Sequence, residues 1–166
     1  MPIDRVVVNA SPLIVLFRSG QAELLGQLWN EVLVPGAVWT EVLAGGPQDA
    51  ASKGLPAASW AKRVEISVIA PVIAAWDLGP GESEVLTFAL AHPGYRAMVD
   101  DAAARRCART LGIPILGTGG ALVLAKRRGL ISSVSESLTA LRNAGLWLSD
   151  ELVNLLKQQA GEAEDK

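Results

Sequence analysis

The stretch Ala97-Met98-Val99-Asp100-Asp101 decides how the fold of this chain is interpreted. It is an apolar run that ends on two adjacent carboxylates, and a helix-forming run over residues 102–108 follows directly. The pattern predicts a strand over residues 96–99 that passes into a helix. Ligands of an open α/β sheet gather at the carboxyl ends of its strands. The two acids therefore either cap the next helix or hold a cation.

Apolar runs and helical patterns alternate along the rest of the chain. Further strands are expected at residues 6–8, 32–34, 64–68 and 113–116. Helices are expected at residues 12–20, 21–29, 36–43, 57–62, 82–91, 102–111, 118–128, 134–144 and 149–159, with a loop over residues 48–56. Strands separated by helices predict a parallel, helix-covered sheet of the α/β class.

The composition predicts one globular domain and excludes several kinds of site. Half of the 166 residues are hydrophobic, and the 15 basic and 17 acidic side chains nearly cancel, so no overall charge indicates a nucleic-acid or membrane partner. The single cysteine, Cys107, excludes an intramolecular disulfide and suits a reducing cytoplasm, where we expect the protein to be found. The single histidine, His92, excludes a multi-histidine metal site. No apolar run is long enough to predict a membrane span. We expect a single domain over residues 1–159 and a polar, disordered tail over residues 160–166.

Oxygen-bearing side chains stand where several predicted elements begin or end. They are Asn9 after the first strand, Glu41 in the helix 36–43, Glu82 and Glu84 at the start of the helix 82–91, and Asp100 and Asp101 after the strand 96–99. Each has a simpler structural explanation, as a helix cap, a turn residue, a partner of a helix dipole or an exposed charge. The carboxyl ends of parallel strands lie on one edge, however, and hard divalent cations such as Mg²⁺ take oxygen ligands. Together these residues predict a metal site at that edge.

The order and spacing of five segments resemble the PIN domain, the fold of the VapC-type toxin ribonucleases, and in particular a prokaryotic PIN-like branch. The segments are residues 7–14, 34–42, 78–84, 100–108 and 117–131. The resemblance extends from about residue 6 to residue 156, which is nearly the whole chain. It implies a PIN-like three-layer α/β/α fold with a short, mainly parallel central sheet. It also implies a metal-dependent endoribonuclease, which could be the toxin of a toxin–antitoxin pair, with Mg²⁺ or Mn²⁺ as cofactor.

The resemblance also assigns roles to individual residues. It implies Glu41, Glu82, Asp100 and Asp101 as catalytic acids, and Asn9, Glu82, Glu84, Asp100 and Asp101 as metal ligands, with Glu82 competing with Glu84 and Asp100 with Asp101 for the main role. Asn9 stands where PIN domains carry their first acid, and its carboxamide offers an oxygen but no charge. We expect Ser11, Arg105, Arg106, Thr118 and Lys126 to contact the substrate. The expected partners are RNA, a cognate antitoxin and a second copy of the chain.

Two other interpretations of the sequence remain open. A catalytically weak or inactive PIN-like module that binds RNA or protein would keep the basic side chains without a working metal site. A phospho-acceptor receiver domain would also carry acids at strand ends. It would place its acid pair after the first strand and a lysine at a late strand end, whereas here the pair follows a late strand and Lys126 lies in a predicted helix. The receiver interpretation therefore ranks last.

Overall fold

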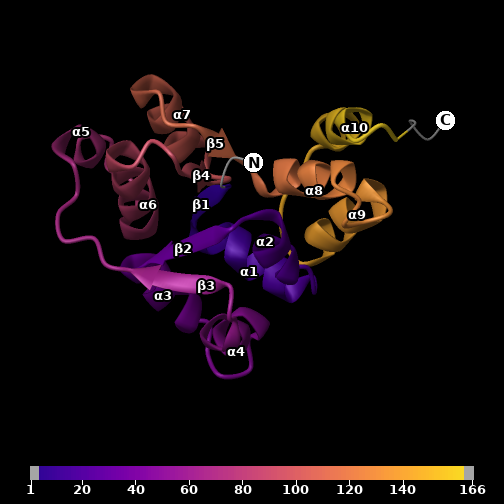
Figure 1. Ribbon diagram of the computed structural model, residues 1–166, viewed down its shortest axis with the longest axis horizontal. Helices are drawn as coiled ribbons and strands as arrows, with labels where there is room; N and C mark the ends of the chain where they lie inside the picture. The colour runs from indigo at the N-terminus through magenta and orange to yellow at the C-terminus, as the bar shows by residue number, and fades with distance from the viewer. Residues whose placement is uncertain (1–3, 163–166) are drawn as a thin grey trace.

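Five short strands form one parallel sheet in the computed structural model, which describes residues 4–162 (Figure 1). The strands are β1 (Arg5–Val8), β2 (Glu31–Pro35), β3 (Ala61–Val64), β4 (Arg96–Met98) and β5 (Ile115–Leu116). Their order across the sheet is β3-β2-β1-β4-β5, and β1 pairs in parallel with both β2 and β4. The run Val6-Val7-Val8 is fully buried, as expected for a strand covered on both faces.

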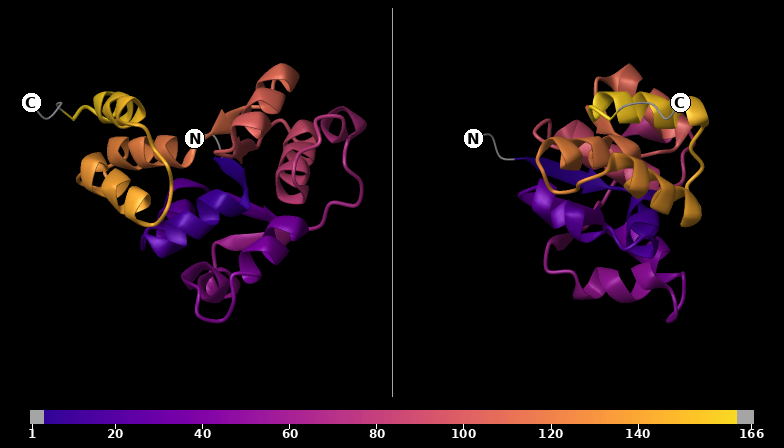
Figure 2. Two further views of the ribbon diagram at one scale, coloured as in Figure 1. Left: turned by 180° about the vertical axis from the view of Figure 1, so that it is seen from behind. Right: turned by 90° about the vertical axis from the view of Figure 1, so that its right-hand side faces the viewer.

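Ten helices of the described residues flank this sheet. They are α1 (Ala10–Arg18), α2 (Glu23–Leu28), α3 (Gly36–Leu43), α4 (Ala50–Ala57), α5 (Pro71–Ala74), α6 (Pro80–Ala91), α7 (Ala102–Leu111), α8 (Thr118–Arg127), α9 (Val134–Asn143) and α10 (Asp150–Gln159). The two views in Figure 2 show α1, α8, α9 and α10 on one side of the sheet and α6 on the other. The chain is therefore a three-layer α/β/α structure, as the sequence predicted.

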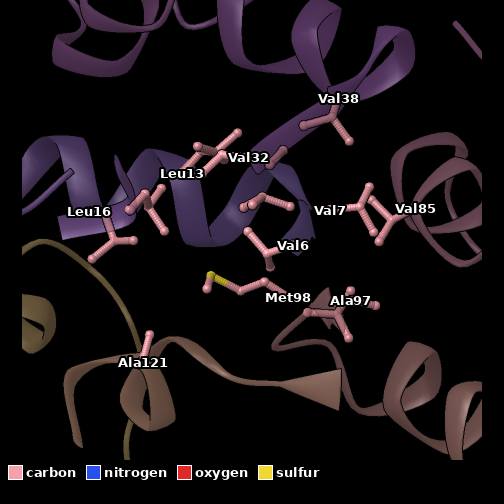
Figure 3. Close-up of a cluster of buried hydrophobic side chains, with 14 of the residues drawn as sticks. Val6, Val7, Leu13, Leu16, Val32, Val38, Val85, Ala97, Met98 and Ala121 are labelled. Atoms are coloured by element: carbon pink, nitrogen blue, oxygen red, sulfur yellow. The ribbon is translucent and has the colours of Figure 1, made fainter. Parts of the chain in front are cut away.

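The core is split between the two faces of the sheet by the alternation of side chains along each strand. In Figure 3, Val6 and Met98 turn toward Leu13 of α1, whereas Val7 turns toward Val85 of α6. All five side chains are completely buried. Burial of these aliphatic groups on both faces holds the strand ends in fixed positions.

The sheet has a topological switch point between β1 and β4. The chain passes from β1 to β2 and β3 on one side, and then returns to place β4 and β5 on the other side. The backbone N–H of Asn9 donates to the carbonyl of Met98 at 3.1 Å, which joins the carboxyl ends of the two strands. In open α/β sheets, ligands bind outside such a point. Asn9 after β1 and Asp100 after β4 both lie at this edge.

The helices α8, α9 and α10 pack together at the C-terminal end of the chain. Of the tail predicted over residues 160–166, residues 160–162 are described and residues 163–166 lie outside the described residues. The Glu162 carboxylate accepts hydrogen bonds from the backbone N–H groups of Val134 and Ser135, at 2.5 and 3.0 Å, and forms an ion pair with Lys126 at 3.5 Å. Glu162 therefore binds the amino end of α9 and fixes the chain after α10.

The segment between α3 and α6 differs from the sequence prediction. The loop expected over residues 48–56 is wrong, because residues 50–57 form α4, with Asp49 as a side-chain cap that accepts from the N–H of Ser52 at 3.2 Å. The helix expected over residues 57–62 is also wrong, because Ala61–Val64 pair with β2 as an edge strand. The short helix α5 was not predicted. No helix within residues 4–162 is long and apolar enough to cross a membrane.

Candidate metal centre

Asn9 occupies the first position after β1 and begins the candidate site. Its side chain is 2% exposed and makes no hydrogen bond to the amino end of α1, although Asn9 is the N-cap residue of that helix. The Nδ2 group donates to Oε1 of Glu82 at 3.4 Å. The Oδ1 atom is buried and has no hydrogen-bond partner within the described residues. A buried acceptor without a partner is costly, so this oxygen is free to bind a donor or a cation.

Glu82 and Glu41 reach Asn9 around the backbone of Gly81. Glu82 stands in the first turn of α6, and Glu41 comes from α3, which packs against α6. A Cβ atom on Gly81 would lie 3.1 Å from Oδ1 of Asn9, 3.3 Å from Cγ2 of Val38 and 3.6 Å from Oε1 of Glu41. The absence of a side chain at Gly81 therefore keeps open the space that these polar groups share.

The carboxylates of Glu41 and Glu82 lie close enough in this space to repel each other. Glu41 is exposed as a residue, but partial burial of its carboxyl raises the pKa of that group, and the neighbouring negative charge of Glu82 raises the pKa further. A cation between the two groups would remove the repulsion.

Glu84 takes a different position from Glu82, although the two are close in sequence. Its Oε1 atom accepts a hydrogen bond from the backbone N–H of Ala37 at 3.0 Å. Ala37 lies in the first turn of α3, where N–H groups have no partner within the helix. Glu84 thus ties α6 to the amino end of α3 and supports the helix that carries Glu41.

Asp100 and Asp101 both bind the amino ends of helices. Oδ1 of Asp100 accepts from the N–H of Thr118 at 2.8 Å, and its Oδ2 accepts from the Thr118 hydroxyl at 2.5 Å. Asp101 is the N-cap of α7 and accepts from the N–H of Ala104 at 2.9 Å. Thr118 is fully buried, so it serves Asp100 rather than solvent. A carboxylate has about four lone-pair positions, so Asp100 keeps acceptor capacity beyond Thr118.

Arg105 of α7 lies beside Asp100, whereas Lys126 of α8 is engaged elsewhere. Nη1 of Arg105 donates to the carbonyl of Val99 at 3.0 Å, and a Cβ on Gly117 would lie 3.0 Å from this Nη1 and 3.1 Å from Oδ1 of Asp100. The Lys126 ammonium donates to the carbonyl of Ser132 at 2.5 Å and pairs with Glu162. Lys126 therefore stabilises the C-terminal helices. Arg106 is exposed on α7.

A cleft of about 210 Å³ opens beside Glu41. Ser11, at the start of α1, is exposed and lines this cleft. The remaining lining residues are Ile14, Val15, Arg18, Ala144, Gly145 and Leu146. Arg18 and residues 144–146 were not predicted as site residues, because the turn after α9 is far from α1 in sequence and carries no acidic residue.

The residues around Gly81 fit a divalent cation. Within residues 4–162, no three acidic, histidine or cysteine side chains stand together as a metal site by themselves. Asn9, Glu41 and Glu82 nevertheless supply a buried amide oxygen without a partner and two carboxylates that repel each other. Hard oxygen donors of this kind suit Mg²⁺ or Mn²⁺, with water and a substrate phosphate completing the shell.

Comparison with known proteins gave one family. A sequence model described as a PIN domain matches residues 5–162, which is nearly the whole chain and includes every residue of the candidate site. A search of curated proteins found no match. The match agrees with the parallel sheet, its helical layers and the position of Asn9 at the end of the first strand.

Proposed function

Because the chain belongs to the PIN-domain family, we propose that it is a divalent-metal-dependent endoribonuclease. One observation carries the proposal: the unpaired Oδ1 of Asn9 shares the space at Gly81 with the carboxylate of Glu41, and Glu82 accepts a hydrogen bond from the Nδ2 group of Asn9. This space lies at the carboxyl edge of the sheet, next to the β1–β4 switch point. Family membership supports a nuclease-type fold and RNA as the partner. An antitoxin and a second copy of the chain remain predictions from the resemblance.

The proposed roles follow from the contacts of each side chain. Asn9 and Glu82 would hold the cation, and Asp100 would border it from the neighbouring strand. When bound, Mg²⁺ or Mn²⁺ would polarise the scissile phosphodiester and lower the pKa of an attacking water. The raised pKa of Glu41 brings this carboxyl closer to neutral pH, which suits a group that accepts a proton. Glu84 and Asp101 would act indirectly, because each binds a helix amino end.

The test is cleavage of a single-stranded RNA by the purified protein with Mn²⁺ and with EDTA. We expect cleavage only with the metal, and a loss of about 100-fold or more in Glu82→Gln. Glu23→Gln, which changes an exposed acid of α2, is the matched control and should cleave like the wild type. If the wild type binds RNA but does not cleave it with either Mn²⁺ or Mg²⁺, the binding-module interpretation replaces the nuclease.

A further inference from the structure

Two adjoining hollows, which together are called the path, lie beside Glu41 and Trp147. The cleft that contains Glu41 and Ser11 shares Gly145 and Leu146 with a second hollow of about 290 Å³. The second hollow is lined by Arg142, Gly145, Leu146, Trp147 and Leu148. The path thus begins at a candidate catalytic carboxylate and ends at an indole ring.

The side chain of Trp147 is far more exposed to solvent than is usual for tryptophan. Its side chain is 83% exposed, whereas its neighbours Leu146 and Leu148 are half-buried and pack against the core. A large aromatic ring buries much apolar area when it can, and its exposure on a monomer indicates a contact surface. The packing of Leu146 and Leu148 does not require an aromatic side chain between them.

The loop that carries Trp147 is held in place on both sides of the ring. Arg142 donates from Nε and Nη2 to the carbonyl of Leu148, at 3.1 and 2.6 Å, and from Nη2 to Asp150 at 3.0 Å. The backbone N–H of Leu146 donates to the carbonyl of Leu141 at 3.0 Å, and Gly145 has a φ of +108°, which glycine adopts readily. The ring is therefore presented by an ordered loop, so little conformational entropy is lost when a flat group binds it.

We propose that Trp147 is a stacking platform for an unpaired base of a single-stranded RNA whose backbone enters the cleft at Glu41. The inference deepens the proposed ribonuclease function and rests on it for the identity of the ligand. Indole rings stack on any base, so this subsite would hold the strand without reading its sequence. Trp147 is a positioning residue in this scheme, since it would touch the substrate away from the reacting phosphate.

The charges along the path favour stacking as the source of affinity. Arg142 faces Asp150, and Arg18 in the cleft pairs with Asp49 at 3.0 Å. Each guanidinium is thus offset by a carboxylate, and the path has little net positive charge for phosphates. The contribution of Trp147 should therefore be insensitive to salt, unlike contacts that release counterions from the RNA backbone. This weak salt dependence distinguishes stacking on Trp147 from binding to a patch of basic side chains.

The experiment measures binding of a fluorescently labelled single-stranded RNA by anisotropy, in EDTA so that cleavage cannot interfere. Trp147→Ala should weaken binding by about 5- to 150-fold, and Trp147→Phe should restore most of the affinity because a phenyl ring also stacks. The slope of log Kd against log salt should be the same in Trp147→Ala as in the wild type. Val72→Ala, which removes a half-exposed apolar side chain on α5, is the control and should bind like the wild type.

Three outcomes would overturn the inference. The wild-type protein does not bind the RNA, or Trp147→Ala binds the RNA as tightly as the wild type does. In the third outcome, Trp147→Ala keeps its RNA affinity and loses only self-association, measured by light scattering. The last result would assign the ring to a protein interface. An RNA carrying abasic positions gives a second measurement, because the wild type should bind it more weakly while Trp147→Ala should not distinguish it from intact RNA. RNA binding through Trp147 without metal-dependent cleavage would contradict the nuclease and leave this inference standing. Metal-dependent cleavage together with unchanged RNA binding in Trp147→Ala would support the nuclease and contradict the stacking role of Trp147.

Discussion

In the proposed site, Asn9 contributes a neutral amide beside the carboxylates of Glu41 and Glu82. Its Nδ2 group already lies toward Glu82, so the amide partly offsets the charge of that neighbour in the metal-free protein. A carboxylate at the same position would have two acceptor oxygens in place of one donor and one acceptor. The amide thus stabilises the metal-free protein but contributes no negative charge for binding a cation.

Asn9→Asp should lower the stability of the metal-free protein and raise its affinity for Mn²⁺. A buried carboxylate facing Glu82 loses the existing hydrogen bond and adds repulsion, at a cost of about 2 kcal/mol near neutral pH. The added charge should tighten metal binding by about tenfold or more, and Mn²⁺ should recover the lost stability by mass action. Thermal melts with and without Mn²⁺ measure both effects. Asn154→Asp, on the exposed face of α10, is the control, and identical melts of Asn9→Asp in both conditions would remove Asn9 from the site.

Gly81→Ala tests the same space by filling it. Gly81 lies in the first turn of α6, and alanine is intrinsically better in a helix by about 0.5–1 kcal/mol, so the metal-free protein should melt close to the wild type. The new Cβ would stand 3.1 Å from Oδ1 of Asn9 and should block the cation. We expect Mn²⁺ to raise the melting temperature of the wild type but not of Gly81→Ala. Equal stabilisation of both proteins would show that a bound cation does not use this space.

At the scale of elements, Glu162 should make stability depend on acid pH. Although burial raises the pKa of the Glu162 carboxyl, the hydrogen bonds from Val134 and Ser135 and the charge of Lys126 lower it below the ordinary value of 4.5. A group with a depressed pKa in the folded state stabilises the protein above its unfolded pKa, and this stability is lost as the pH falls through the folded pKa.

Glu162→Gln should therefore unfold more easily than the wild type at pH 7, by about 1 kcal/mol, because the negative charge at the amino end of α9 is gone. The difference should shrink as the pH falls below 4.5 and vanish once Glu162 is protonated in the folded wild type. Urea unfolding over a pH series measures it. Glu151→Gln, an exposed change on α10, should show no such dependence, and a constant difference for Glu162→Gln at all pH values would contradict the assignment.

Helices were predictable from sequence wherever local signals agreed with packing. The expected ranges 36–43 and 102–111 match α3 and α7, since each combines an apolar face with clear end signals. The helix α4 was missed because Gly54 and Pro56 are typical of loops, whereas its Asp49 cap and buried Leu55 stabilise it in the fold. The strand expected over residues 64–68 lies three residues earlier, at Ala61–Val64, because the charged Lys62 and Arg63 of this edge strand leave no apolar alternation that would mark its start.

The candidate site was predictable in its residues but not in their pairings. Asn9, Glu41 and Glu82 were selected from their places beside strand ends and helix starts, and the structure brings them around Gly81. The bond from Asp100 to Thr118 and the role of Glu84 at α3 join residues 18 and 47 positions apart, so they depend on tertiary packing. The exposure of Trp147 is equally a property of the folded chain, because an isolated tryptophan in a sequence indicates a core residue more often than a surface one.

At the scale of the whole molecule, the order of the sheet creates the site. Strands β1 and β4 are far apart in sequence, yet they are neighbours, so the groups that follow them meet at one edge. Short-range patterns in the sequence predict strands but not which strands pair. The resemblance to a known family implied the three layers and the mainly parallel sheet, but no strand order was predicted. The same fold brings the turn after α9 to α1, where Gly145 and Leu146 line both the cleft at Glu41 and the adjoining hollow at Trp147.

The only cysteine, Cys107, lies completely buried in α7, and burial raises the pKa of its thiol. A thiol in this state reacts slowly with maleimides and other alkylating reagents, because the reactive species is the exposed thiolate. A second cysteine engineered on the surface would therefore be labelled alone, without first removing the native one. Dyes or spin labels attached in this way, for example at Val72 on α5, would report on domain motion and ligand approach in the otherwise unmodified protein.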